Sequence, residues 1–311
     1  MNGSNLSRQY KHFFSNYRQW DQRDHAEQYL LFPRNIGPNL AIDETSLSCG
    51  ELYTFVTNRD AHGREGSLVA VVRGTKAEDV IAVLNRIPLN KRKIVKEITL
   101  DLSATMMLIA GTAFPNATIT NDRFHVHKLF YDAIDDLRIS LRWMARDLEN
   151  EEIERCRQQH IPYVPFRYAN GDTRKQLLAR AKYILTKHSS KWTPSQQWRA
   201  DIIFEFYPEL KMAYDLALEL TDIFNMRTRV SVARLALARW YDKVDKMCSS
   251  PFRTVTETFR NHYDTILNYF INRSTNAGAE SFNAKVKAFR SQFRGVADIP
   301  FFLFRLSKLC A

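Results

Sequence analysis

Three aspartates occupy positions at which the carboxylates of an enzyme could meet. Asp43, Asp101 and Asp122 lie in or directly after short runs rich in β-branched residues, which are typical of strands. Glu280 lies near the C-terminus, in the first turn of a predicted helix capped by Asn276. Carboxylates that converge with open positions suit Mg²⁺ or Mn²⁺, and two such ions can activate a nucleophile and stabilise a leaving phosphate oxygen. The residue types therefore predict metal-dependent chemistry on a phosphate ester.

The elements that must position these acids follow a definite order. The sequence predicts, in turn, strands over 40–45, 51–58 and 67–73, a helix over 76–86, a strand over 94–100, a helix over 105–114 and a strand over 117–121. Short turns between the first three strands predict antiparallel pairing, whereas the strand–helix–strand unit predicts parallel pairing. This order matches an α/β ribonuclease-H-like core with a mixed five-stranded sheet. In such a sheet the first and fourth strands are neighbours, so Asp43 and Asp101 can converge, and Glu280 can reach them from the later helix.

A long helical block follows the predicted core. Apolar residues recur every three or four positions from Val126, and helical patterns continue to about Asn272. We therefore predict a helical N-terminal segment (1–36), the first part of the core (37–125), an all-helical insertion after the fifth strand (126–272) and a C-terminal core helix that carries the third acid (273–311). Four tryptophans of the block could stack on an unpaired base, but core packing is the expected role of most of them: Trp143, Trp192, Trp198 and Trp240.

The composition points to a polyanionic partner. The 311 residues carry a formal net charge of +11, which favours nucleic acid first and an anionic membrane second. Residues 271–311 alone carry +5, from seven Lys or Arg and two Asp or Glu. No apolar run approaches the roughly 18 residues of a membrane span, and the first residues lack a signal-peptide pattern. The cysteines are widely spaced and form neither a zinc nor a disulfide pattern, which fits a reducing cytoplasm: Cys49, Cys156, Cys248 and Cys310.

Each acid also has a structural explanation when it is considered alone. Asp43 could be a turn residue at a strand end, and Asp101 could cap the helix that follows it. Glu280 could complement a helix dipole, and His125 is more often a surface or packed histidine than a catalyst. The combination favours the catalytic interpretation, because each acid falls where the predicted topology requires one.

Five strings of the sequence are more specific than its composition. They are Leu40-Ala41-Ile42-Asp43-Glu44-Thr45, Thr99-Leu100-Asp101, Phe114-Pro115-Asn116-Ala117, Asp122-Arg123-Phe124-His125-Val126 and Asn276-x-x-x-Glu280-x-x-Asn283-x-Lys285-x-Lys287. These strings resemble the DDE transposases of bacterial insertion sequences of the ISL3 type. The resemblance implies a ribonuclease-H-like catalytic domain with a helical insertion, cleavage at the ends of an insertion sequence, and strand transfer into target DNA. It also implies two Mg²⁺ or Mn²⁺ ions held by Asp43, Glu280 and a second aspartate, in a bacterial cytoplasmic protein associated with the nucleoid.

The resemblance leaves the second acid open between Asp101 and Asp122. Related Mutator-like and hAT-type transposases carry a Cys/Asp-x-x-His signature downstream of the second catalytic acid, and Asp122-Arg-Phe-His125 matches that signature. The topology also puts the second acid at the end of the fourth strand. We therefore assign Asp101 as the second acid and treat Asp122 and His125 as a supporting pair, with Asp122 as the alternative catalytic residue.

Basic and amide residues near the acids are the predicted DNA contacts: Arg123, Asn276, Asn283, Lys285, Lys287, Arg290 and Arg294. The implied partners are double-stranded DNA of the element ends and target, and further copies of the chain on DNA; no membrane partner is expected. Longer relatives begin with a cysteine zinc module and a helix-turn-helix, and neither pattern occurs here, so a separate polypeptide could supply end recognition. Another ribonuclease-H-like DNA nuclease, or an inactive DNA-binding transposase remnant, is the alternative function.

Because neither recognition pattern occurs, we predict weak discrimination between element ends and random duplex by this chain alone. The measurement is competition binding with both DNAs at one salt concentration. A specificity ratio above ~10³, the range of site-specific proteins, would contradict the prediction and show that end recognition resides in this chain.

Overall fold

The computed structural model describes residues 8–48, 50–247, 249–292 and 296–311. The chain divides into two compact units. We call Met1–Asp122 with Asn272–Ala311 the core unit, and Arg123–Ile271 the helical unit. The chain thus leaves the core after Asp122 and returns to it 150 positions later at Asn272, so the two segments of the core are distant in sequence.

A mixed six-stranded sheet forms the centre of the core unit. Its strands are β1 (Tyr29–Leu31), β2 (Asn39–Ser48), β3 (Glu51–Asn58), β4 (Leu68–Arg73), β5 (Glu97–Leu100) and β6 (Thr118–Asn121). Their order across the sheet is β1-β4-β3-β2-β5-β6. The pairs β1–β4, β4–β3 and β3–β2 are antiparallel, and the pairs β2–β5 and β5–β6 are parallel. The predicted mixed α/β class and the antiparallel and parallel halves of the sheet are therefore present.

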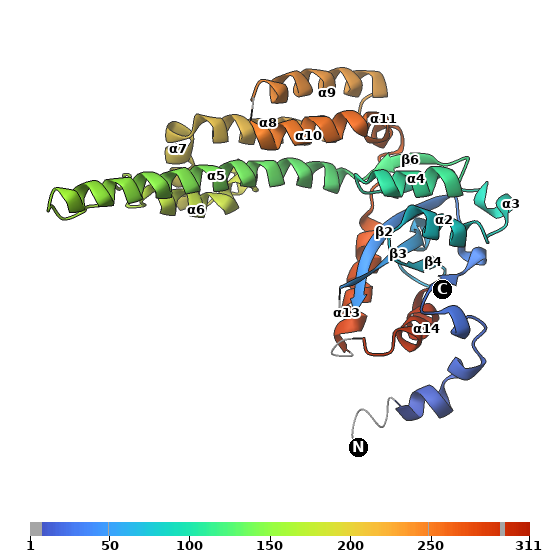
Figure 1. Cartoon of the computed structure of the whole chain (residues 1–311). Helices are drawn as coiled ribbons and strands as arrows, with labels where there is room; N and C mark the ends of the chain where they lie inside the picture. The colour runs from blue at the N-terminus through green and yellow to red at the C-terminus, as the bar shows by residue number, and fades with distance from the viewer. Residues whose placement is uncertain (1–7, 49, 248, 293–295) are drawn as a thin grey trace. The chain divides into compact units, whose positions relative to one another are not determined.

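Helices cover both faces of this sheet (Figure 1). One face carries α2 (Ala77–Leu84) and α4 (Ala104–Ala113), and the other carries α13 (Ala277–Gln292) and α14 (Ile299–Cys310). Alternation along the strands directs the side chains: in β2, Leu40 and Ile42 pack toward α2 and α4. The alternate residues of β2 face α13, and among them Asp43 and Thr45 bond to Asn283 of that helix.

The sheet has six strands where the sequence predicted five, and the N-terminal segment is not purely helical as predicted. The additional strand β1 pairs with the edge strand β4, and Leu30 at its centre is fully buried beneath α13 and α14. Among the described residues before it, the helices are all short, η1 (Tyr10–Phe14), η2 (Asn16–Gln19) and η3 (Arg23–His25), and η4 (Pro33–Asn35) follows it. Exposure of Phe13 and Phe14 explains why the aromatic periodicity there was misleading, since these rings do not face the core.

Strand β5 is shorter than predicted. Residues 94–96 were expected to belong to it, but the strand begins at Glu97, after the one-turn helix α3 (Leu89–Arg92). Ile94 is exposed, whereas Ile98 and Leu100 are buried against α4. The β-branched pair at 94–95 therefore indicated a strand that begins three residues later.

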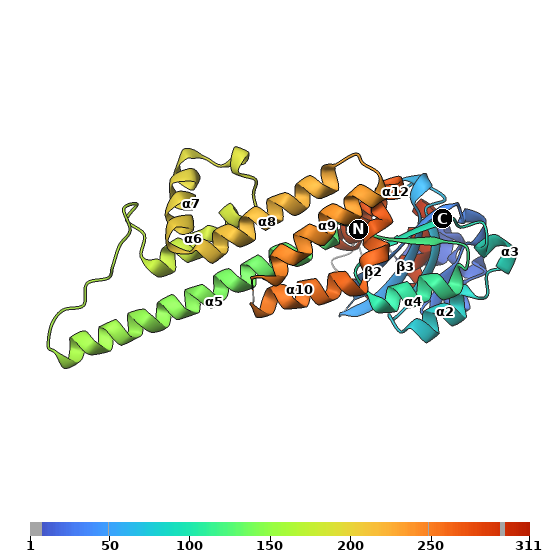
Figure 2. The ribbon, with the colours of Figure 1, turned by 90° about the horizontal axis from the view of Figure 1, so that it is seen from above.

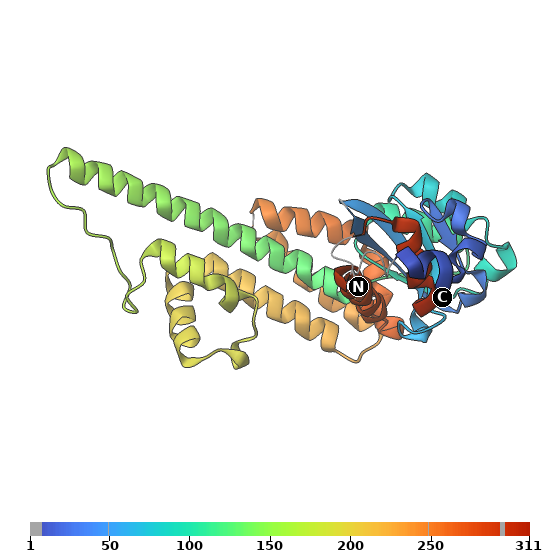
Figure 3. The same cartoon turned by 90° about the horizontal axis from the view of Figure 1, so that it is seen from below.

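The helical unit consists of helices and connecting loops (Figures 2 and 3). Its helices are α5 (Arg123–Gln158), α6 (Arg174–Leu185), η6 (Ser189–Lys191), α7 (Pro194–Phe206), α8 (Pro208–Asn225), α9 (Val230–Asp245), α10 (Ser250–Asn261), α11 (Tyr263–Leu267) and α12 (Tyr269–Asn272). Aromatic residues hold the long helix α5 against α9 and α10: Phe130 contacts Trp240 and Phe252 at ring-centroid distances of 5.0 and 5.3 Å. The first part of α5 is therefore part of a packed bundle.

Two expectations from composition can be compared with the described part of the chain. Within it, no helix combines the length and the apolar character needed to cross a bilayer. Cys156 and Cys310 are free thiols, and Cys49 and Cys248 lie outside the described residues.

A buried polar network joins the first residue of β5 to the segment that leads into α13. Glu97 is 4% exposed, and its carboxylate pairs with the Arg59 guanidinium at 3.1 Å. It also accepts hydrogen bonds from the hydroxyls of Ser274 (2.7 Å) and Thr120 (3.1 Å). Burial of the Glu97 carboxylate is tolerated because Arg59, Ser274 and Thr120 satisfy its oxygens. The network therefore fixes the start of α13 on the sheet.

We predict that Glu97→Gln lowers the free energy of unfolding by about 3 kcal/mol, because it leaves the largely buried Arg59 guanidinium without a counter-charge. Urea unfolding of the full chain measures this loss. Glu65→Gln is the control, since Glu65 is exposed and has no polar partner among the described residues. Equal midpoints for the two variants would contradict a structural role for the Glu97 network.

Candidate active site

The three aspartates line up across neighbouring parallel strands. Ala41 of β2 is opposite Thr99 of β5, and continuing this register by two residues brings Asp43 beside Asp101. The pair Leu100–Asn121 joins β5 to β6, and the next residue of each strand is Asp101 and Asp122. Carboxyl ends of parallel strands share one edge of a sheet. The predicted convergence of Asp43 and Asp101 at this edge thus has a basis in the strand register.

Asp43 is held by the helix that covers its face of the sheet. The Asn283 side-chain amide donates to Asp43 Oδ2 at 2.5 Å, and the backbone N–H of Glu44 donates to Asp43 Oδ1 at 2.7 Å. The same Asn283 amide accepts a hydrogen bond from the Thr45 hydroxyl at 2.8 Å. Asn283 is therefore bonded through both atoms of its amide, which restricts the rotation of the Asp43 carboxylate.

Asp101 closes β5 at a turn and does not cap α4. The N-cap of α4 is Ser103, whose hydroxyl accepts a hydrogen bond from the backbone N–H of Met106. The backbone carbonyl of Asp101 accepts hydrogen bonds from Ser103 N–H (2.8 Å) and from the Asn121 side chain (2.9 Å). The simple structural explanation of Asp101 as a helix cap is therefore wrong.

The Asp101 carboxylate also influences β2 electrostatically. Burial, followed by the negative charge of Asp101, raises the pKa of Glu44 above its ordinary value. A like charge disfavours ionisation of a neighbouring carboxyl group. The Glu44 and Asp101 carboxylates therefore influence each other, although Glu44 lies on the opposite face of β2 from Asp43.

Asp122 holds the beginning of α13. Its carboxylate is 2% exposed, and Oδ1 accepts a hydrogen bond from the backbone N–H of Asn276 at 3.0 Å. The Asn276 side chain is fully buried, and its Oδ1 accepts from the Thr99 hydroxyl at 3.0 Å. An acid at the N-terminus of a helix satisfies a backbone donor and complements the helix dipole. Asp122 therefore has a defined positioning contact in the core unit.

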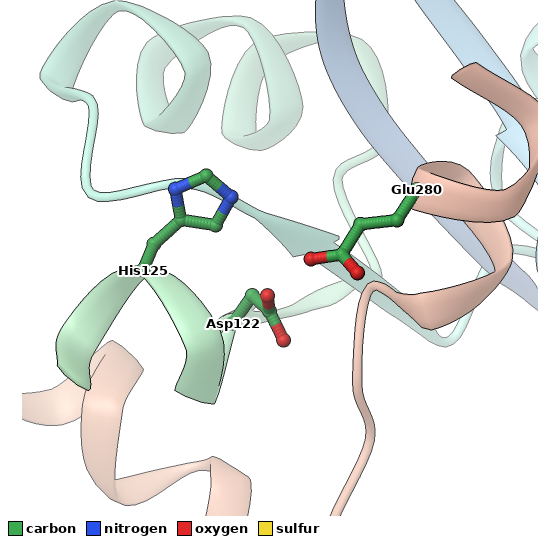
Figure 4. A group of neighbouring side chains, drawn as sticks. All are labelled: Asp122, His125 and Glu280. Atoms are coloured by element: carbon green, nitrogen blue, oxygen red, sulfur yellow. The ribbon is translucent and has the colours of Figure 1, made fainter. Parts of the chain in front are cut away.

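Glu280, one turn into α13, brings the third carboxylate to this edge. Asp122, His125 and Glu280 each offer a ligand atom, and these atoms lie within 4.8 Å of one another. Figure 4 shows the two carboxylates directed toward a common space, with the imidazole beside them. His125 follows Asp122 by three residues, in the first turn of α5, so chain connectivity keeps it near Asp122. Glu280 is exposed and His125 half-buried. Neither Asp43 nor Asp101 belongs to this group.

The predicted DNA contacts divide into buried and exposed residues. Asn276 and Asn283 are buried and hydrogen-bonded within the core unit, which favours a positioning role over the predicted contact with DNA. The Lys285 ammonium donates to the Gly63 carbonyl at 2.8 Å, and the Arg290 guanidinium to the Ser46 carbonyl at 3.1 Å.

The other predicted contacts differ in their surroundings. Lys287 is exposed and has no hydrogen-bond or ion-pair partner among the described residues. In the helical unit, the Arg123 guanidinium lies over the Phe224 ring, 5.9 Å from its centroid. Arg294 lies outside the described residues. Of these cations, Lys287 is the one best placed for a phosphate.

Sequence reasoning missed the polar partners of the acids. Thr45 bonds to Asn283 of α13, Thr99 bonds to Asn276 just before that helix, and Glu97 bonds to Ser274. The sequence did contain an indication of these partners. Thr45 and Thr99 lie two residues from Asp43 and Asp101, so each threonine lies on the same face of the sheet as its aspartate. Consecutive polar residues on one face of a buried strand indicate a polar covering element, but the sequence alone does not say which element provides it.

The comparisons with known proteins identify the family. A family model described as a transposase, of the ISL3-type DDE class, matches residues 40–306. This match covers most of the chain, including both segments of the core unit from β2 onward and the whole helical unit. The chain therefore belongs to the ISL3-type DDE transposase family. Neither the curated proteins nor the solved structures gave a significant match.

Because the family acts on DNA, we predict that Lys287→Gln weakens binding to all duplex sequences alike. Loss of one phosphate contact should flatten the slope of log K against log salt by about 0.9. Lys285→Gln should change the slope less, because the Lys285 ammonium is already held by the Gly63 carbonyl. Anisotropy titrations over a range of salt concentrations measure both slopes. An unchanged slope for Lys287→Gln would show that Lys287 does not contact a DNA phosphate.

Proposed function

We propose that this chain is a divalent-metal-dependent DNA transposase that cleaves DNA at the ends of an insertion sequence and joins those ends to target DNA. The observation that carries the proposal is the row of Asp43, Asp101 and Asp122 across three parallel strands, with Glu280 brought to the same edge by α13. Membership of the transposase family supports the reaction class.

We infer a ribonuclease-H-like fold for the core unit. Without the additional edge strand β1, the order β4-β3-β2-β5-β6 places the first predicted strand beside the fourth, as that fold requires. The helical unit is then an insertion between the fifth strand and the helix that carries the third acid. The N-terminal segment, with β1, forms a part that precedes the catalytic core.

We assign Asp43, Asp101 and Glu280 as the metal-holding triad. Support for Asp101 comes from its register beside Asp43. Support for a different role of Asp122 comes from its burial and its hydrogen bond to the backbone of Asn276. An acid that already holds α13 is suited to position Glu280. The neighbourhood of Asp122 and Glu280 keeps the triad Asp43, Asp122 and Glu280 as the alternative.

The proposed triad has the donor chemistry of a site for hard cations. All three residues are carboxylates, and oxygen ligands with room for water suit Mg²⁺ and Mn²⁺. Asp43 and Asp101 are half-buried and Glu280 is exposed, so water can reach the edge of the sheet where they lie. When bound, two such ions activate the attacking oxygen and stabilise the leaving oxygen of a phosphodiester.

The chain's own residues prepare this site in defined ways. Asn283 fixes the Asp43 carboxylate, and Asp122 fixes the first turn of α13 through Asn276. Together these bonds set where Glu280 can lie relative to the sheet. Preorganisation of this kind matters because displacement of a ligand by about 1 Å can cost two orders of magnitude in rate.

The proposed reaction exchanges one phosphorus–oxygen bond for another. In cleavage the incoming oxygen is that of water, and in strand transfer it is a DNA hydroxyl; in both, the displaced oxygen leaves with a proton. Both partners are then double-stranded DNA, one from the element and one from the target. We further propose that the active species contains more than one copy of the chain, and that a separate polypeptide can contribute end recognition.

The assignment predicts different losses for two conservative substitutions. Asp101→Asn keeps the side-chain shape and removes the charge, so it should abolish cleavage and lower Mn²⁺ affinity while DNA binding persists. Asp122→Asn should reduce the cleavage rate on the order of 10–100-fold, as loss of a residue that orients a metal ligand does. Cleavage of a labelled end substrate at saturating Mg²⁺ measures the rates, and isothermal titration with Mn²⁺ measures binding independently of turnover.

Thermal melting of both variants is the folding control. A dead Asp122→Asn with an active Asp101→Asn would reverse the assignment and make Asp43, Asp122 and Glu280 the triad. A wild-type chain that binds DNA but never cleaves it would favour the inactive remnant.

A further inference from the structure

A groove in the helical unit is not explained by the proposed catalytic chemistry. It lies between α5 and α6, encloses about 600 Å³, and is lined chiefly by Ile139, Arg142, Trp143, Arg146 and Lys175. We call it the α5–α6 groove. Its volume is within the range of ligand sites, roughly 300–1,000 Å³. No acidic residue is among the described residues that line it.

The cations of the groove differ in how they are neutralised. Lys175 pairs with Glu149, Arg146 hydrogen-bonds Asp147, and the buried Arg138 bonds Asp135. Arg142 is exposed and makes no hydrogen bond, ion pair or ring contact with any described residue. The groove therefore presents the uncompensated guanidinium of Arg142 beside three paired cations, two guanidiniums and one ammonium, and such a surface attracts an anionic ligand.

Trp143 gives the groove an exposed aromatic surface. Its side chain is 52% exposed, and the Arg146 guanidinium lies 4.1 Å from its ring centroid. Two of the other tryptophans expected in the core behave differently: Trp240 is fully buried, and the indole N–H of Trp192 donates to backbone carbonyls. Trp198 is as exposed as Trp143 but does not line the groove. Core packing, which was expected of most of these residues, therefore does not explain Trp143.

We propose that the α5–α6 groove binds single-stranded DNA, with an unpaired base stacked on Trp143 and the adjacent phosphate held by Arg142. A phosphate-binding cation next to an exposed aromatic face is the combination with which proteins hold single strands. Duplex DNA presents phosphates and base edges but keeps its base faces stacked, so it can use Arg142 and not Trp143.

This inference rests on the proposed function, because strand cleavage leaves free strand ends. Bases that are already unpaired enter an aromatic site at the lowest cost. The groove lies wholly within the helical unit and shares no residue with the row of aspartates. Its occupancy can therefore be measured without catalysis.

The experiment is anisotropy of a labelled oligothymidylate of about 12 nucleotides, within the site sizes of single-strand binders, titrated with the full chain in EDTA. Trp143→Ala should weaken binding on the order of tenfold, the effect of losing one stacked base. Trp143→Phe retains an aromatic face and should keep most of the affinity. Trp198→Ala is the matched control: Trp198 is equally exposed on α7 and does not line the groove.

The phosphate contact has its own variant. Arg142→Gln should flatten the salt slope for the single strand by about 0.7. Arg239→Gln, at an exposed arginine of α9, is the control for a change of net charge and should leave the slope unaltered. On a blunt duplex, Trp143→Ala should bind as the wild type does.

Three results would overturn the inference: unchanged single-strand affinity of Trp143→Ala, equal losses in Trp143→Ala and Trp198→Ala, or equal losses on duplex and single strand. Asp101→Asn should retain full single-strand affinity. If the wild-type chain cleaves DNA while Trp143→Ala binds single strands normally, only the groove assignment fails. If the wild-type chain binds no DNA, the proposed function fails with it.

Discussion

The hydrogen bond from the Asn276 backbone N–H to the Asp122 carboxylate connects segments 154 residues apart in the sequence. It determines where α13 begins, and Glu280 lies one turn beyond that point. Without this anchor, the third carboxylate would have no fixed relation to the sheet, because the chain between them forms a separate unit. The site therefore depends on a contact between the two ends of the helical unit's segment of the chain. The hydrogen bond from Ser274, two residues before Asn276, to Glu97 supports this contact.

Polar residues on a covered sheet face impose the second constraint. Thr45, Thr99 and Glu97 lie under α13, where an unsatisfied polar group would cost about 1–3 kcal/mol each. Asn283 of α13, Asn276 just before this helix, and Ser274 satisfy them. Phe282 and Val286 of α13 pack against Phe55 and its neighbours. The same face of α13 thus carries an amide that holds Asp43 and apolar residues that anchor the helix to the core.

The acids differ in how far they are buried. Asp122 is buried and bonded to backbone, Glu280 is exposed, and Asp43 and Asp101 are intermediate. The proposed assignment follows this difference, because it gives the buried acid a positioning role and the more exposed acids a metal-binding role. In the helical unit, Trp240 is fully buried and Trp143 is exposed, so these two residues of one type also lie in different environments.

The sequence by itself determined the order and type of most elements, because alternation, helical periodicity and turn residues are local signals. It also identified Asp43, Asp101, Asp122 and Glu280, since strand ends and helix starts are readable from it. The prediction from sequence missed β1, because three residues of an edge strand carry too little periodicity. It also placed residues 94–96 in β5, because β-branched residues there resemble a strand although they lie outside it.

Only the tertiary structure decided which polar groups satisfy one another. The burial of Asn276, the bond between Asn283 and Asp43, and the neighbourhood of Asp122 and Glu280 all depend on α13 returning to the sheet. The exposure of Trp143 likewise depends on which faces of α5 its neighbours cover. Such pairings join residues far apart in the chain. The local sequence around a polar residue contains no information about which distant group will bury that residue and bond to it.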